Sequence, residues 1–135
     1  MAFRGLGVSV KAHLSDLANG VPTNDRDPST AGSYDVCFRR TVDADPENAN
    51  QSADDRRQEA VIGSTLLERH LLGFGFHIST GRFLDSKSAT LCSGSRYLGG
   101  GVPTMSWNQK TQAICIGMCA PGGKGPGLRP RAVIS

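Results

Sequence analysis

The cysteines in the second half of the chain are the residues whose spacing comes closest to that of a metal site. Cys115 and Cys119 stand four residues apart, which places both thiols on one face of either a strand or a helical turn. A structural zinc ion needs four ligands and usually takes them as two such pairs, but only Cys92, Cys37 and His77 are left to complete the set. Half of a motif predicts no metal site and no cofactor, because cysteine also packs as a small hydrophobic residue. A disulfide among Cys92, Cys115 and Cys119 is the alternative in an oxidising compartment.

A nucleophilic site would need a serine or cysteine on a sharp turn or beside a histidine. The string CSGSR at 92–96 lacks the first glycine of the Gly-x-Ser-x-Gly turn that exposes a catalytic serine. A pair of Cys92 with His70 or His77 depends wholly on the fold, and such pairs can be proposed for almost any sequence. The chain is therefore predicted not to be an enzyme.

The glycine-rich stretch at 122–125 resembles the tip of a phosphate-binding loop. In the full motif, four residues separate a first glycine from the Gly-Lys pair, and a serine or threonine follows the pair. Here Met118 replaces that first glycine and Gly125 replaces the hydroxyl residue. The sequence therefore excludes a nucleoside triphosphatase of this class.

The acidic residues between positions 43 and 55 are predicted to be solvated. Asp43, Asp45 and Glu47 lie in an Asn-rich loop, and Asp54 and Asp55 are followed directly by two arginines. Carboxylate pairs do acid–base chemistry only when burial separates their pKa values. The alternating ligands and central glycine of a calcium loop are also missing.

Charge is distributed unevenly along the chain. The first 85 residues hold nine of the Lys and Arg residues and all twelve acids, whereas residues 86–135 hold six basic residues and no acid, which gives the overall +3. Such asymmetry indicates an anionic partner. The six are Lys87, Arg96, Lys110, Lys124, Arg129 and Arg131.

The elements that must position these residues are short. A helix is expected at 54–72, beginning with a capping-box-like Ser52–Asp55 and ending at Gly73. Strands are expected at 6–10, 34–42, 74–78, 89–92 and 112–118, with a helical turn at 12–17 and a flexible connector at 97–103. The prediction is an α+β fold in which one main helix packs on a small, mostly antiparallel sheet. A single globular domain, 1–119, would precede an irregular, basic Pro/Gly-rich tail, 120–135.

The apolar residues of the expected helix form a stripe wider than one core-facing surface requires. Leu67 and Leu71 share one face with Ala60, whereas Ile62 and Leu66 fall on the far side. Either the helix is buried under two layers, or it packs on its own sheet with one face and on a partner with the other. The predicted interface residues are Ile62, Leu66, Lys124, Arg129 and Arg131.

These features predict a small non-enzymatic structural or interaction subunit of a larger assembly, such as a virion, phage or ribonucleoprotein component. Its partners would be copies of itself or a neighbouring chain, contacted through the helix face and the C-terminal arm. The alternative is an accessory protein that binds nucleic acid through the acid-free region 86–135. No segment approaches the roughly 20 apolar residues that span a bilayer, and no signal peptide is evident. We therefore expect a cytoplasmic or particle-associated protein without a membrane partner.

Overall fold

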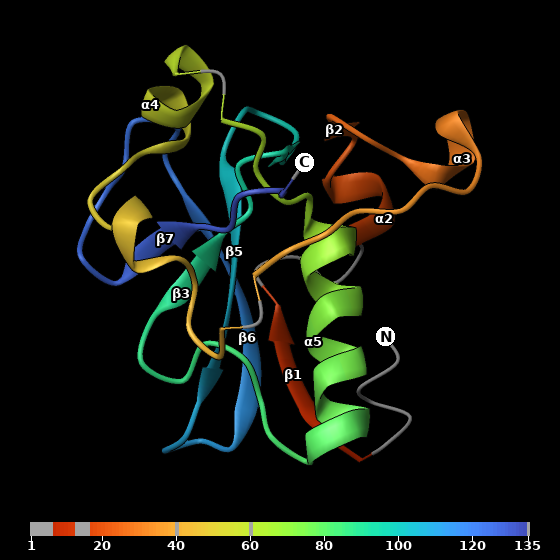
Figure 1. Cartoon of the computed structure of the whole chain (residues 1–135), viewed down its shortest axis with the longest axis vertical. Helices are drawn as coiled ribbons and strands as arrows, with labels where there is room; N and C mark the ends of the chain where they lie inside the picture. The colour runs from red at the N-terminus through yellow and green to blue at the C-terminus, as the bar shows by residue number, and fades with distance from the viewer. Residues whose placement is uncertain (1–6, 13–16, 40, 60, 135) are drawn as a thin grey trace.

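A five-stranded mixed sheet forms the centre of the molecule (Figure 1). The computed structural model describes residues 7–12, 17–39, 41–59 and 61–134. The strand order is β1-β6-β5-β3-β7, with parallel pairing at the two outer positions and antiparallel pairing between the inner strands. The strands are β1 Ser9–Ala12, β3 Ala89–Leu91, β5 Val102–Asn108, β6 Ala113–Cys119 and β7 Leu128–Pro130.

The hairpin of β5 and β6 is the longest paired segment of this sheet. Its register runs from Val102 opposite Cys119 to Asn108 opposite Ala113. The side chain of Asn108 closes the turn by accepting hydrogen bonds from two backbone N–H groups of the turn. The expectations of strands at 89–92 and 112–118 are confirmed to within a residue or two by β3 and β6. The connector expected at 97–103 instead ends in β5, and Tyr97 is buried.

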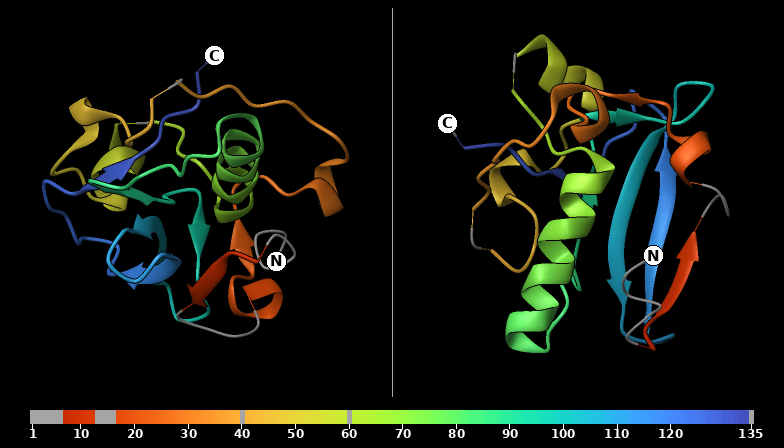
Figure 2. Two further views of the ribbon diagram at one scale, coloured as in Figure 1. Left: turned by 90° about the horizontal axis from the view of Figure 1, so that it is seen from below. Right: turned by 90° about the vertical axis from the view of Figure 1, so that its right-hand side faces the viewer.

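One long helix, α5 Leu66–Thr80, lies along one face of the sheet (Figure 2). It begins with a complete capping box, in which Thr65 accepts from the Glu68 backbone and the Glu68 side chain accepts from the Thr65 backbone. It ends at Gly81, whose left-handed conformation suits a glycine. The expected helix at 54–72 is therefore wrong in its bounds, and the expected strand at 74–78 is wrong altogether. Gly73 does not end the helix but lies in its middle. A glycine is needed there because a Cβ at this position would collide with the Arg69 side chain.

A short helix, α4 Ala53–Gln58, occupies the first part of the expected long helix. Its predicted start is confirmed, since Asp55 N–H donates to the Ser52 hydroxyl and Ser52 N–H donates to the Asp55 carboxylate, each over 3.0 Å. The remaining elements are α2 Leu17–Gly20, β2 Thr23–Asn24, α3 Pro28–Ala31, η1 Pro46–Asn48 and β4 Ser95–Arg96, with β2 and β4 forming a separate antiparallel pair.

The predicted fold class is wrong, because the molecule is a mixed sheet with one long helix rather than a helix on a mostly antiparallel sheet. The C-terminal segment is not an irregular arm throughout, since β7 pairs in parallel with β3. Pro130 is tolerated there because β7 is an edge strand with one neighbour. Among the described residues of the expected strand 34–42, the only β-pairing is an isolated bridge between Cys37 and Ile134. The turn expected at 12–17 falls largely on residues 13–16, outside the described part of the chain.

The core lies between α5 and the sheet. It is built from Val10, Val21, Leu66, Cys92, Tyr97, Met105, Ile114 and Ile116. A smaller cluster of Ala53, Leu91 and Val102 includes a residue of α4. Phe83 is sandwiched between His77 of α5 and Trp107 of β5, with ring centroids 4.2 and 3.7 Å away. His77 is thus a packing residue that joins the end of α5 to the sheet.

Candidate functional site

A buried cluster of charges lies between α5, β3 and the C-terminal segment. Asp85 is fully buried, and its carboxylate pairs with Arg69 at 3.0 Å and with Arg131 at 3.1 Å. It also accepts from the Ala44 N–H at 2.7 Å and from the Thr90 hydroxyl. The second cation is stabilised by carbonyl groups, since Arg131 donates to the oxygens of residues 41 and 42. Buried ions persist only when they are paired in this way.

This cluster holds the chain together and leaves little room for a ligand. The cavity beside Arg69 has a volume of about 10 Å³, enough for about one water molecule. Burial lowers the pKa of the Arg69 guanidinium. Asp85 takes a positive φ of 59°, a left-handed conformation that residues other than glycine seldom adopt. Asp85 therefore joins three separate segments of the chain at one carboxylate.

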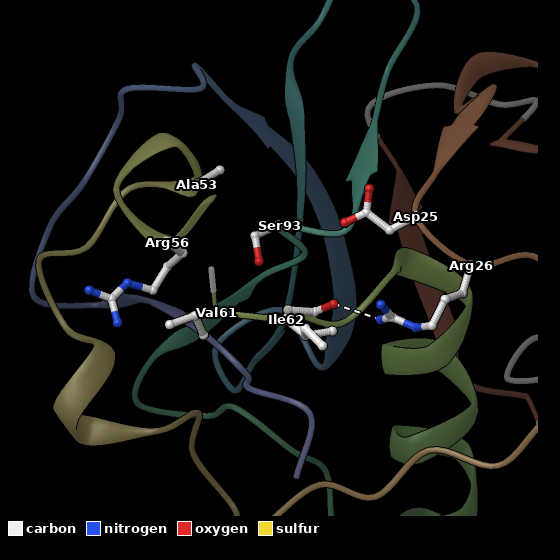
Figure 3. Close-up of a pocket in the computed structure, with 8 residues that line it drawn as sticks. Asp25, Arg26, Ala53, Arg56, Val61, Ile62 and Ser93 are labelled. Carbon is white, nitrogen blue, oxygen red and sulfur yellow. Dashed lines mark hydrogen bonds between the residues drawn. The ribbon is translucent and has the colours of Figure 1, made fainter. Parts of the chain in front are cut away.

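The largest cavity that we describe, about 410 Å³, opens between α4 and the β2–β4 pair (Figure 3). It is lined by Asp25, Arg26, Ala53, Arg56, Val61, Ile62, Gly63 and Ser93. Its walls combine an aliphatic side from the 53–62 segment with charged groups from the residues that follow β2. A cavity of this size falls within the range of small-molecule sites, roughly 300–1,000 Å³.

Arg26 is held rigidly at the cavity wall. Its Nε donates to Glu68 at 2.8 Å, and its Nη2 donates to the other Glu68 oxygen at 2.6 Å and to the Gly63 carbonyl at 2.7 Å. The hydrogen bond with Glu68 raises the pKa of the arginine. Burial alone would raise the pKa of the Glu68 carboxyl, but hydrogen bonds from Arg26, the Thr65 backbone and Tyr34 lower it below its ordinary value.

Ser93 supplies a buried hydroxyl at the same cavity. Its oxygen has no hydrogen-bond partner among the described residues. It lies so close to the backbone of Gly63 that a Cβ added there would be 1.7 Å away. In Figure 3 the Ser93 side chain projects between the residue 61–62 segment and Asp25, whereas the guanidinium of Arg56 points away from the centre. Arg56 pairs instead with Glu59 at 2.7 Å.

The outer surface of α5 carries an apolar stripe. The two charged residues of the helix, Glu68 and Arg69, are both turned inward. Leu67, Leu71 and Ile78 are 44%, 56% and 60% exposed, and they lie within about 40° of one another around the helix. Glu68 and Arg69 are buried in the two ionic clusters just described. The helix therefore departs from the usual arrangement, because both of its charged residues face inward and three of its large aliphatic residues face solvent.

The predicted interface residues are scattered. Leu66 is only 7% exposed and belongs to the core, whereas Ile62 is exposed and lines the cavity. Arg131 is 1% exposed and pairs with Asp85. Arg129 donates to the carbonyls of residues 126 and 44, and Lys124 lies 3.8 Å from Asp55. The three tail cations therefore all make contacts within the chain.

The sulfur and carboxylate candidates are also separated. None of the four cysteines forms a disulfide, and within the described residues no group of three His, Cys, Asp or Glu side chains could hold a metal ion. Burial raises the pKa of the Cys92 thiol to about 12, which keeps it protonated and poorly nucleophilic at neutral pH. Asp45 is not solvated as expected. It is buried, and it accepts from the Ala132 N–H at 3.0 Å.

Sequence reasoning missed Arg26, Glu68 and Ser93 as neighbours. The Thr65-x-x-Glu68 capping box was available as a helix start, but nothing local predicts that Arg26, 42 residues away, pairs with the same carboxylate. No protein-family model, curated protein or solved structure matches the chain. Among the described residues, no helix has the length and apolar character needed to cross a membrane.

Proposed function

We propose that this protein is a non-enzymatic structural subunit that assembles with a second copy of itself through the outer face of α5. The observation that supports the proposal is the reversed polarity of the helix. Leu67, Leu71 and Ile78 share one exposed stripe, while Glu68 and Arg69 are turned inward. Exposed apolar residues that occur singly need no explanation, but a contiguous stripe on the longest helix is typical of a docking surface.

A second copy is the occupant that this face suits best. The stripe carries no formal charge, so it has no preference for an acidic or a basic partner and is complementary to itself. Two copies related by a twofold axis would place the same residues on both sides, which is the commonest arrangement of soluble dimers. Gly75 is also exposed on this side of α5, with nothing within 4 Å of a Cβ added there, so a second helix could approach closely.

The stripe would make a concentration-dependent dimer. Full burial of an exposed leucine or isoleucine contributes roughly 1.5–3 kcal/mol. Since these three side chains are already about half buried, each would add about 1 kcal/mol, or roughly 6 kcal/mol for the two copies. That gain is comparable with the cost of association, roughly 4–15 kcal/mol, so the expected dimer is weak unless flanking residues contribute.

Light scattering after size-exclusion chromatography tests the proposal on a dilution series of the whole chain. The mass should rise from 14.3 kDa at low concentration towards twice that value at high concentration. Leu71→Lys should keep the protein monomeric at every concentration. Leu98→Lys is the matched control, because Leu98 is 81% exposed but lies outside α5. A wild-type monomer throughout, or a dimer that Leu71→Lys leaves intact, would refute the proposal.

The C-terminal arm does not enter this proposal. Residues 128–130 form β7, which pairs with β3, and Arg131 forms an ion pair with Asp85. This segment therefore makes its contacts within its own chain. Arg131 is also buried, so it is not available to bind nucleic acid as one of the cations of the region 86–135. No observation on the remaining basic residues favours that alternative over the apolar helix face.

A further inference from the structure

We propose that the cavity between α4 and the β2–β4 pair binds a small uncharged ligand that combines an aliphatic group with a carbonyl, which accepts a hydrogen bond from Ser93 (Figure 3). This site is separate from the α5 face and does not depend on the dimer. Its volume, about 410 Å³, admits a small molecule of this class.

The hydroxyl of Ser93 is the polar group of this cavity that lacks a partner. The residue is 7% exposed, and its oxygen makes no hydrogen bond within the described residues. A buried hydroxyl in this state is unfavourable, because it has lost its contacts with water and gained none in return. In Figure 3 its side chain projects between the residue 61–62 segment and Asp25, whereas Arg56 points away from the centre. A ligand carbonyl that accepts the Ser93 O–H removes this cost.

The charged residues of the wall favour an uncharged ligand. Arg26 donates two hydrogen bonds to Glu68, at 2.8 and 2.6 Å. The hydrogen bond with Glu68 raises the pKa of Arg26, and the negative charge of Asp25 acts in the same direction. Arg56 forms its ion pair with Glu59. Each charged lining residue therefore already interacts with an opposite charge of the chain, so a charged ligand would lose water without gaining an unpaired partner.

The aliphatic wall sets the rest of the ligand. Ala53, Val61 and Ile62 supply apolar surface to the cavity. Ile62 is 55% exposed, so a hydrocarbon group resting on it would remove apolar area from water. A short branched chain provides that area without adding a second polar group, for which the cavity has no unpartnered hydroxyl other than that of Ser93 among the described residues. These contacts together select a branched aliphatic molecule with one carbonyl, such as an amide.

An NMR titration of the isotope-labelled whole chain tests this assignment with three probes of similar shape: 3-methylbutanamide, which is uncharged, 3-methylbutanoate, which is an anion, and 3-methylbutylamine, which is a cation. The amide should bind about tenfold or more tightly than either charged analogue, because it gives up less hydration on entering the cavity. Its largest shifts should fall on the backbone N–H signals of residues 61–63 and 93–94. Equal or tighter binding of a charged analogue would overturn the proposal, and so would the absence of saturable shifts at these residues.

Variants separate binding from folding. Ser93→Ala should weaken amide binding several-fold, yet leave the ligand-free protein at least as stable, because it removes a buried hydroxyl that has no partner. Ile62→Ala should also weaken binding several-fold, and it should fold because Ile62 is largely exposed. Ser79→Ala is the matched control, because Ser79 is exposed near the far end of α5 and should leave binding unchanged. Unchanged amide affinity in Ser93→Ala or in Ile62→Ala would contradict the assigned site.

Discussion

The ionic cluster around Asp85 predicts an unequal response to the loss of its members. It contains two arginines and one carboxylate, all 3% exposed or less. Asp85→Asn leaves Arg69 and Arg131 buried side by side with no acid to balance them. Removing one partner of a buried pair costs about 3–5 kcal/mol, and here two cations lose the same partner. The expected loss is therefore at or above the upper end of that range.

Arg131→Met should cost less, because Asp85 and Arg69 remain as a balanced pair. The change removes hydrogen bonds to the carbonyls of residues 41 and 42 and to Thr90. Unsatisfied buried acceptors cost about 1–3 kcal/mol, and the methionine fills much of the vacated volume. Since a domain of this kind has a total stability of roughly 5–15 kcal/mol, this variant should fold.

Urea unfolding followed by the fluorescence of Trp107, the only tryptophan, measures both changes in the free energy of unfolding. Arg39→Met is the control, because Arg39 and Glu47 form an ion pair that is about half exposed. Its loss should change the free energy of unfolding by less than about 1 kcal/mol. If Arg131→Met destabilises the protein as much as Asp85→Asn, the charge-balance argument is wrong.

Further outcomes follow from the surroundings of single residues. The lowered pKa of Glu68 contributes stability that is present above its ordinary value of 4.5 and is lost as pH falls through the folded-state pKa, so Glu68→Gln should flatten the acid limb of a stability–pH profile. Gly94→Ala should destabilise the fold by about 1–3 kcal/mol in thermal or urea unfolding, because its Cβ would lie 2.8 Å from a backbone oxygen. Gly122→Ala has open space and should be neutral within about 0.5 kcal/mol. In a mass-spectrometric alkylation time course of the native protein, exposed Cys37 should react well before Cys92, and the reverse order would show that Cys92 is accessible.

The sequence predicts the parts of this fold that depend on local patterns. The alternation at 112–118 corresponds to β6, and the Ser52–Asp55 box does begin a helix. The same reasoning fails at 74–78, where Phe74, Phe76 and Ile78 alternate as in a strand but lie in α5. Gly75 within this stretch and Gly73 just before it lower the helix propensity, but the capping box at Thr65 together with packing on the sheet outweighs that effect.

The ionic contacts were beyond local reasoning because their partners are far apart in the chain. Arg131 belongs to a Pro/Gly-rich segment whose composition indicates a free tail, yet its guanidinium meets Asp85, 46 residues earlier. The composition of a segment predicts whether it is ordered in isolation. It does not show whether the rest of the fold offers an unpaired strand with which the segment can form hydrogen bonds. The edge of β3 accepts residues 128–130 as β7, and this pairing carries Arg131 into the interior.

Glu68 connects the cavity wall to the α5 face. Its carboxylate fixes Arg26 at the cavity wall, and its burial helps to set the rotation of α5 about its own axis. Arg69 reinforces that rotation through Asp85, because neighbouring residues on a helix point about 100° apart and both must face inward. With two adjacent positions held in this way, Leu67 and Leu71 have to face outward. The apolar stripe is thus a geometric consequence of the ion pairs that Glu68 and Arg69 make.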